Sequence, residues 1–248
     1  MLPRLDELLV QQGLAESRTR AQALILAGRV LVDDVPVDKA GTRVREGAEL
    51  RVRGAVRAYV SRGGDKLAGA LSDLGVDPAG KACLDVGAST GGFTDCLLQR
   101  GASRVVAVDV GYGQLHPTLR GDPRVRVLER THARDLTAAD LAGPIDLVTL
   151  DASFISARLL LPGLRALVPR ADFLVLVKPQ FEVGKGRVGK GGVVRDDALR
   201  AEAVAAVRDC GLAEGLAVRG EAESRLAGPK GNREVFLWLA PAGTPLPS

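Results

Sequence analysis

Residues 83–98, CLDVGASTGGFTDCLL, place an apolar run, a glycine-rich stretch and an apolar-periodic stretch in direct succession. The apolar run predicts a buried strand, and the spacing of Phe93, Cys96 and Leu97 predicts a helix just after the loop. The loop glycines allow the backbone to approach a ligand closely. Ligands of open α/β sheets bind at the carboxyl ends of the strands, so this loop predicts a ligand site.

From about residue 80 onward, predicted strands alternate with helical stretches such as 93–100 and 196–210. Runs such as Phe-Leu-Val-Leu-Val indicate strands that are buried on both faces, hence a largely parallel sheet between helices. The last two strands follow each other too closely for a long crossover, which favours a terminal antiparallel hairpin. The predicted strands are Ala82–Val86, Val105–Asp109, Val125–Leu128, Ile145–Asp151, Phe173–Lys178, Leu216–Val218 and Val235–Leu239. The expected fold is a Rossmann-like α/β domain.

Three kinds of ligand loop compete for residues 83–98. The glycine spacing does not fit the G-x-G-x-x-G fingerprint of dinucleotide-binding proteins, and no lysine follows as a phosphate loop requires. The segment instead resembles the D-x-G-x-x-x-G-G-F loop of S-adenosylmethionine-dependent methyltransferases. This resemblance implies a site for S-adenosyl-L-methionine formed by Asp85, Gly87, Ala88, Ser89, Thr90, Gly91, Gly92, Phe93, Asp109, Val110 and Phe154. Asp109 ends the next predicted strand, where a carboxylate can accept hydrogen bonds from both ribose hydroxyls.

Residues 1–60 form a separate predicted unit, and residues 61–245 the catalytic domain. Two short helices, the second capped by Ser17, precede short strands at 30–32, 35–37 and 48–52. The stretch RLDELLVQQGLAESRTRAQALILAGRVLVDDVPV resembles the S4 RNA-binding fold. Gly63-Gly64 predicts a bend before the helix that follows. Residues predicted to contact RNA are Arg4, Arg18, Arg20, Arg57, Arg62, Lys185, Arg187 and Lys190.

Lys185, Arg187 and Lys190 lie in a glycine-rich segment, residues 184–192, which nearly matches a phosphate loop. Gly191 replaces the Ser or Thr that such a loop requires, and no helix follows directly, which argues against nucleotide hydrolysis. The segment is interpreted as a basic loop that touches the RNA backbone, with a plain flexible loop as the alternative.

Four ionisable residues stand at ends of predicted elements that face the ligand site. Lys66 begins a helix, Asp151 and Lys178 end strands, and Glu234 precedes the last strand. This set resembles the Lys-Asp-Lys-Glu tetrad of FtsJ-like ribose 2′-O-methyltransferases. The segments YVSRGGDKL, LDVGASTGGFTD, VDVGYGQL, SFIS, VKPQFEVGKG and GNREVFLWL, behind an S4-like unit, resemble the TlyA family, historically called hemolysin A. The resemblance runs from about residue 4 to 240 and implies 2′-O-methylation of cytidine in ribosomal RNA, in some members on both subunits.

The chemistry of such a transfer favours the same residues. A ribose hydroxyl is a poor nucleophile, and an ordinary lysine, with a pKa of about 10.4, cannot accept its proton at neutral pH. Lys178 is therefore predicted to activate the hydroxyl, either as a neutral base or by stabilising a developing alkoxide. Asp151 would orient Lys178, while Lys66 and Glu234 would tune the charge and hold the ribose. The absence of an Asn/Asp-Pro-Pro-aromatic run and of a Pro-Cys pair favours transfer to oxygen over nitrogen or pyrimidine carbon.

Charge and composition argue against several other classes of function. The formal net charge is +4, no apolar run reaches the roughly 18 residues of a membrane span, and the three cysteines lack metal-ligand spacing. We therefore expect a cytoplasmic protein that binds ribosomal RNA, needs no metal and no membrane, and is a monomer. Two alternatives remain open: a non-catalytic RNA-binding or ribosome assembly factor on the same fold, and a hemolysin-type membrane-active protein. A pseudouridine synthase is excluded because it would have no use for a methyl-donor loop.

Overall fold

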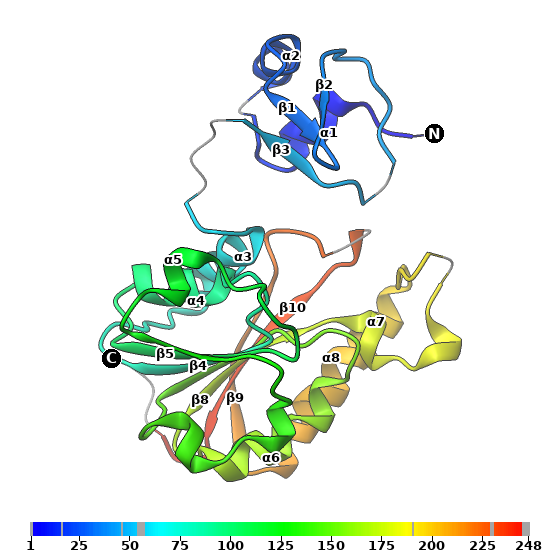
Figure 1. Ribbon diagram of the computed structural model, residues 1–248. Helices are drawn as coiled ribbons and strands as arrows, with labels where there is room; N and C mark the ends of the chain where they lie inside the picture. Colours follow the sequence, from blue (N-terminus) through cyan, green and yellow to red (C-terminus); the bar gives the residue numbers. More distant parts are fainter. Residues whose placement is uncertain are drawn as a thin grey trace. The chain divides into compact units, whose positions relative to one another are not determined.

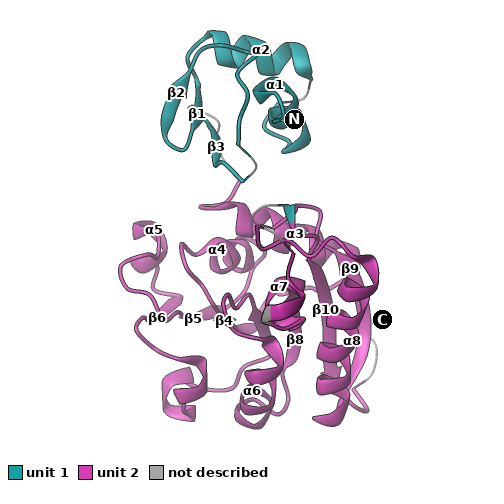
Figure 2. Cartoon of the chain, turned by 90° about the vertical axis from the view of Figure 1, so that its right-hand side faces the viewer, with its two compact units in different colours: residues 1–57, 229–231 teal, residues 58–228, 232–248 magenta. Residues whose placement is uncertain are grey.

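The computed structural model describes residues 2–15, 17–45, 47–53, 58–189, 191–228 and 231–244 of the chain (Figure 1). The chain divides into two compact units (Figure 2). Unit 1 comprises residues 1–57 and 229–231, and unit 2 comprises residues 58–228 and 232–248.

Unit 1 packs two helices against a small sheet. Helices α1 (Leu5–Gln11) and α2 (Arg18–Leu26) precede β1 (Val30–Val32), β2 (Val35–Val37) and β3 (Leu50–Val52). The three strands form an antiparallel sheet in the order β2-β1-β3. The helix stripes bury Leu5, Leu9 and Ile25 completely, so a small apolar core holds the unit together.

Unit 2 is built on a seven-stranded sheet in the order β6-β5-β4-β7-β8-β10-β9. Its strands are β4 (Ala82–Val86), β5 (Arg104–Val108), β6 (Val125–Leu128), β7 (Leu147–Leu150), β8 (Asp172–Val177), β9 (Leu216–Glu223) and β10 (Val235–Pro241). Strand β10 pairs antiparallel with both β8 and β9, while the pairs from β6 to β8 are parallel. The predicted mostly parallel sheet with an antiparallel last strand is confirmed.

Helices cover both faces of this sheet (Figures 1 and 2). One face packs against α3 (Arg62–Leu74), α4 (Gly92–Gln99) and α5 (Pro117–Arg120). The other packs against α6 (Leu161–Leu167) and α8 (Asp197–Ala213), and α7 (Pro179–Glu182) packs on α8. Short 3-10 helices span Ala133–Asp135, Ala138–Leu141, Ala157–Leu159 and Lys185–Arg187. Alternate residues of β4, such as Cys83 and Leu84, enter opposite cores, so both faces are buried as the apolar runs predicted.

The prediction of a bend at Gly63-Gly64 is wrong. Both glycines lie inside α3, which begins at Arg62. A Cβ at Gly64 would overlap the ring of Tyr59, so Gly64 lets the preceding segment pack closely on the helix. This glycine pair therefore serves close packing rather than a turn.

Candidate active site

The glycine loop leaves β4 between the ends of its two neighbouring strands. The N–H groups of Gly87 and Ala88 both donate to the carbonyl of Val108, at 2.9 and 3.1 Å. Gly87 has φ +87°, and a Cβ there would lie 2.6 Å from the carbonyl oxygen of Asp151. Gly91, with φ +94°, caps the start of α4. These are backbone conformations that favour glycine, so the sequence dictates this tight loop.

Asp85 lies beneath the loop and not at its surface. Its carboxylate is fully buried and accepts hydrogen bonds from Thr94 (2.7 Å) and Thr149 (3.0 Å). Burial raises the pKa of Asp85 to about 6, against the two hydroxyl hydrogen bonds that lower it. The residue ties β4 to α4 and β7, so its predicted part in cofactor binding can only be indirect in this arrangement.

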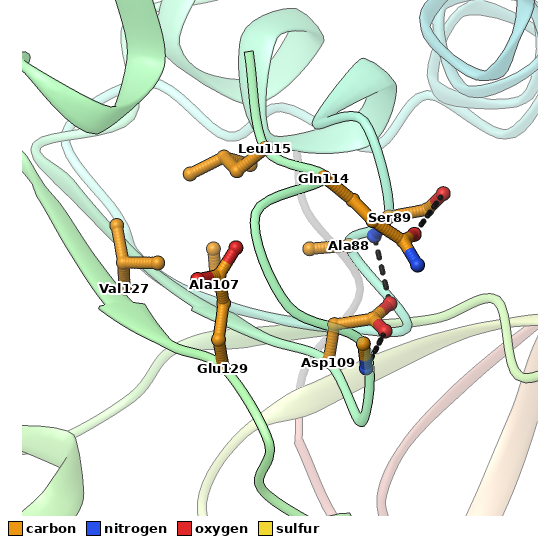
Figure 3. A pocket seen from close by; sticks show the side chains of 9 residues that line it. Ala88, Ser89, Ala107, Asp109, Gln114, Leu115, Val127 and Glu129 are labelled. Atoms are coloured by element: carbon orange, nitrogen blue, oxygen red, sulfur yellow. Dashed lines mark hydrogen bonds between the residues drawn. The ribbon is translucent and has the colours of Figure 1, made fainter. Parts of the chain in front are cut away.

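A hollow opens beside the loop, at the ends of β5 and β6 (Figure 3). It is lined by Ala88, Ser89, Ala107, Asp109, Gly111, Gln114, Leu115, Val127 and Glu129. Asp109 accepts the backbone N–H groups of Ser89 (2.8 Å) and Gly111 (2.7 Å). A carboxylate oxygen has two lone-pair sites, so Asp109 retains the capacity to accept further hydrogen bonds from a ligand.

Other members of the predicted cofactor set lie elsewhere. Phe93 is only 3% exposed and stacks on Phe236 with a centroid distance of 6.0 Å, so its ring belongs to the core. Phe154 is 92% exposed, has φ +66° and contacts Phe181 at a centroid distance of 5.4 Å. Val110 is 60% exposed beside Asp109. None of these three lines the hollow as the structure describes it.

The predicted catalytic residues form two ion pairs. Lys178 Nζ lies 2.5 Å from Asp151 Oδ1 and donates to Ser153 Oγ at 2.9 Å. Lys66 Nζ lies 2.5 Å from Glu234 Oε2. The side chains of Lys178 and Lys66 are only 9% and 12% exposed. Both ammonium groups are thus held in fixed positions with little contact with solvent.

The sheet register brings both pairs to one edge. Val177 of β8 pairs with Val235 of β10, so Lys178 and Glu234 follow at the same end of adjacent strands. Asp151 directly follows β7, the other neighbour of β8. Adjacent strands lie about 4.8 Å apart. The four side chains therefore gather next to the glycine loop, whose Gly87 abuts Asp151.

One acceptor atom in this cluster, Glu234 Oε1, has no hydrogen-bond partner among the described residues, whereas Asp151 Oδ1 contacts Lys178. Glu234 is completely buried, and a Cβ at Gly228 would overlap its carboxyl group. Burial of a charged carboxylate is costly, so Glu234 depends on its ion pair with Lys66.

The loops after β7 and β8 are joined by Glu182, which is 7% exposed. It accepts hydrogen bonds from Ser156 Oγ (2.5 Å), the N–H of Ala157 (2.7 Å) and Arg158 Nε (3.1 Å). Asp151 and Ser153 lie just before Ser156 in the loop after β7, and Lys178 lies four residues before Glu182 in the segment after β8. The hydrogen bonds of Glu182 therefore hold together the two loops that carry these residues.

The predicted RNA-binding residues differ in whether they are paired with an acid. In unit 1, Arg4 and Arg18 both donate to Asp6, and Arg20 is exposed. In unit 2, Arg62 is exposed and donates to the carbonyl of Ala227 at 3.4 Å, whereas Arg187 is bonded to Glu202. Arg57, Lys190 and the side chain of Lys185 lie outside the described residues.

Sequence reasoning missed Ser153, Glu182, Gln114 and Glu129. The first two stand within the segments SFIS and VKPQFE, which are quoted above, but their partners are distant in sequence. Glu129 follows β6 and accepts the N–H of Gly113 (2.9 Å) and Arg120 (2.5 Å). The Arg120 hydrogen bond holds the pKa of Glu129 below its usual range. The position of Glu129 directly after β6, at the carboxyl end of a strand, is the sequence signal that could have predicted its place beside the ligand site.

Comparison with known proteins identifies the family. A family model described as FtsJ-like methyltransferase matches residues 59–240, and one described as S4 domain matches residues 3–50. A Mycobacterium tuberculosis protein named 16S/23S rRNA (cytidine-2′-O)-methyltransferase TlyA is 54% identical over 95% of this chain and 89% of its own. The chain belongs to the TlyA family of FtsJ-like methyltransferases.

Two further TlyA-like relatives span nearly the same length. A Brachyspira hyodysenteriae protein named Hemolysin A is 41% identical over 94% of this chain and 98% of its own. A solved structure from Streptococcus thermophilus, which also carries a hemolysin name, has a TM-score of 0.77 and 38% identity. It covers 98% of this chain and 90% of its own. Among the described residues of this chain, no helix is long and apolar enough to cross a membrane.

The methyl donor of FtsJ-like methyltransferases is S-adenosyl-L-methionine, and the residues of this chain fit it. The tight glycine loop leaves room for a ligand beside Ala88 and Ser89, and Asp109 is positioned to accept ribose hydroxyls (Figure 3). The ion-paired cluster lies at the same edge of the sheet, where the methyl group must be delivered.

Proposed function

We propose that this protein methylates the ribose 2′-hydroxyl of cytidine in ribosomal RNA, on both subunits, in the cytoplasm. The observation that carries the proposal is the paired cluster of Lys66, Asp151, Lys178 and Glu234 beside the glycine loop. The name of the Mycobacterium tuberculosis relative, 16S/23S rRNA (cytidine-2′-O)-methyltransferase, supports cytidine in ribosomal RNA as the substrate and both subunits as targets. We further propose that the protein acts as a monomer and needs no metal.

In this proposal Ala88, Ser89 and Asp109 hold the adenosine part of S-adenosyl-L-methionine. When bound, the cofactor supplies a sulfonium methyl group that is already activated for transfer. The protein must therefore place the 2′-oxygen in line with that methyl group and deal with the proton of the hydroxyl.

Lys178 is the residue we assign to the hydroxyl. Its Nζ is held by Asp151 and Ser153, so it meets the 2′-oxygen without having to be ordered first. There the ammonium stabilises the negative charge that develops on oxygen while the hydroxyl proton passes to water, or the neutral amine accepts that proton itself. Lys66, whose side chain is 12% exposed, helps to hold the ribose, while the completely buried Glu234 keeps the Lys66 ammonium in place and balances its charge.

The test is methyl transfer from labelled S-adenosyl-L-methionine to purified, unmethylated ribosomal subunits. The product nucleotide is mapped by the alkali resistance of its 3′ linkage, which a 2′-O-methyl group confers. We expect incorporation at such a site, and loss of turnover with nearly unchanged cofactor binding in Lys178→Ala. Lys81→Ala is the matched control, since Lys81 precedes β4 at the opposite edge of the sheet.

Wild-type protein that binds the cofactor and the subunits but transfers no methyl group would contradict this function. That outcome would favour a non-catalytic RNA-binding factor. Full turnover by Lys178→Ala would refute the role of Lys178 while leaving the reaction itself in place.

A further inference from the structure

Unit 1 contains a fully buried carboxylate that holds two arginines. Asp6 in the first turn of α1 is 0% exposed. It accepts hydrogen bonds from Arg4 Nε (2.9 Å) and Nη2 (3.0 Å), Arg18 Nε (3.0 Å) and Gln22 Nε2 (2.8 Å). The backbone N–H of Glu7 donates to it as well, at 3.1 Å. Such a set of donors compensates for the large cost of burying a charge.

The charge state of Asp6 is therefore secure. The Arg4 hydrogen bond holds its pKa well below the usual range against the effect of burial, and Gln22 and Arg18 lower the pKa further. The carboxylate stays ionised wherever the protein is folded near neutral pH, so it is a permanent anchor for the guanidinium groups.

The two arginines remain partly exposed to solvent. Their side chains are 34% and 53% exposed, although each gives its Nε–H to a buried acid. A guanidinium has five N–H donors in a rigid fork, so both retain donors on the outer side. Arg18 also lies 3.4 Å from Glu7, an acid on the surface that is 43% exposed. The result is a pair of cations, one at the N-cap of α1 and one at the first residue of α2, that are both anchored on the Asp6 carboxylate.

We propose that Asp6 is a positioning residue for RNA binding: its carboxylate fixes Arg4 and Arg18 so that their outer N–H donors bind RNA phosphate together. The proposal rests on the proposed function, because it assigns ribosomal RNA to these arginines. Fixing a long side chain before binding removes part of the entropy cost of forming a phosphate contact.

A positioning role and a simple charge effect predict opposite signs. RNA is a polyanion, so removal of a negative charge from unit 1 strengthens binding if charge alone matters. If Asp6 acts through the arginines, Asp6→Asn weakens binding although it makes the protein more positive. This difference in sign is what the experiment measures.

The experiment uses the full chain and unmethylated ribosomal subunits, with kcat and KM for methyl transfer measured separately. For Asp6→Asn we expect KM to rise about tenfold, equivalent to about 1.4 kcal/mol, with kcat unchanged. The matched control is Asp38→Asn, which removes an exposed acid of the same unit. Its KM should stay the same or fall.

Two further variants separate positioning from loss of folding. Arg4→Lys with Arg18→Lys keeps every charge at the surface but lacks the rigid fork, so KM should rise about as much as in Asp6→Asn. In a background of Arg4→Gln and Arg18→Gln, Asp6→Asn should add nothing to KM if it acts only through the arginines. If Asp6→Asn shows no cooperative thermal unfolding transition, it is not folded, and the KM of the Arg4→Lys, Arg18→Lys variant then tests the proposal.

An unchanged or lower KM in Asp6→Asn that remains folded overturns the proposal, as does a wild-type KM in the lysine variant. Failure of the proposed function would look different, because wild-type protein would then transfer no methyl group. In that case direct binding of the same variants to the subunits tests Asp6, with the same order of affinities expected.

Discussion

Replacement of Asp85 by Asn should change how the stability of unit 2 depends on pH. Asp85 is buried between Thr94 and Thr149, and its pKa is raised from 3.8 to about 6. The raised pKa means that the folded state binds the proton more tightly than the unfolded state. Stability therefore falls as the pH rises from about 4 to about 6, and is constant above that window.

The magnitude follows from the size of the shift. The difference between 3.8 and about 6 corresponds to about 3 kcal/mol between pH values well below and well above both pKa values, of which about 2 kcal/mol falls between pH 4 and pH 6.5. An asparagine has nearly the same shape, and its amide can exchange hydrogen bonds with both hydroxyl groups, yet it does not titrate. The free energy of unfolding of Asp85→Asn, relative to wild type, should therefore rise by about 2 kcal/mol from pH 4 to pH 6.5.

Trp238 makes the assay specific for unit 2. It is the only tryptophan of the chain, lies in β10 and is 7% exposed. Its fluorescence reports urea unfolding of cofactor-free protein at a series of pH values. The matched control is Asp209→Asn, on the exposed side of α8, whose difference from wild type should not vary with pH.

A constant offset between Asp85→Asn and wild type is expected, because the two side chains form different hydrogen bonds. Only the change of the offset with pH matters. A difference that stays flat between pH 4 and pH 6.5 would refute the reasoning, since it would mean that burial does not perturb this carboxyl group.

Three further substitutions have expected outcomes. Gly228→Ala should lower the rate of methyl transfer about 10- to 100-fold at unchanged cofactor affinity, because the new Cβ would displace the Glu234 carboxyl group. An unchanged rate would show that methyl transfer does not depend on the position of Glu234. Glu182→Gln should lower the free energy of unfolding of unit 2 by about 1.5–3 kcal/mol, followed by Trp238 fluorescence in urea, and a loss under 0.5 kcal/mol would contradict its linking role. Arg187→Gln should change KM for subunits less than about twofold, since Glu202 already binds Arg187, whereas a tenfold rise would mean that RNA displaces Glu202.

The strands of the sheet were predictable because their signal is local. Apolar runs such as 173–177, bounded by Asp172 and Lys178, gave strands at or within a few residues of their observed ends. The exception in length is β9, which continues to Glu223 where a strand was expected to end at Val218. Residues 219–223 are mostly polar or charged, and they are held in the sheet by pairing with β10, which a local pattern cannot reveal.

The identities of the site residues were also accessible, as was the role of Asp151 in orienting Lys178. The ends of strands predict which edge a residue occupies, and the edge was enough to group Asp151, Lys178 and Glu234. The ion pair between Lys66 and Glu234 depends on the register of β10 and on α3, far away in sequence, which a local pattern does not reveal. For the same reason the sequence did not reveal that Arg187, which is predicted to contact RNA, is bonded to Glu202, fifteen positions further along.

In both units a buried carboxylate holds a cationic side chain that we assign to substrate. Asp6 and Glu234 are completely buried, while the cations that they hold, Arg18 and Lys66, extend toward solvent or the ligand site. A carboxylate side chain is short and has few rotamers, whereas a lysine or arginine loses up to about 2 kcal/mol of side-chain entropy when it is ordered. When the acid is fixed by folding, that ordering is complete before substrate arrives, so the binding energy of the RNA is not spent on it. The acids are thus as necessary to the arrangement as the cations, even where they touch neither RNA nor the methyl donor.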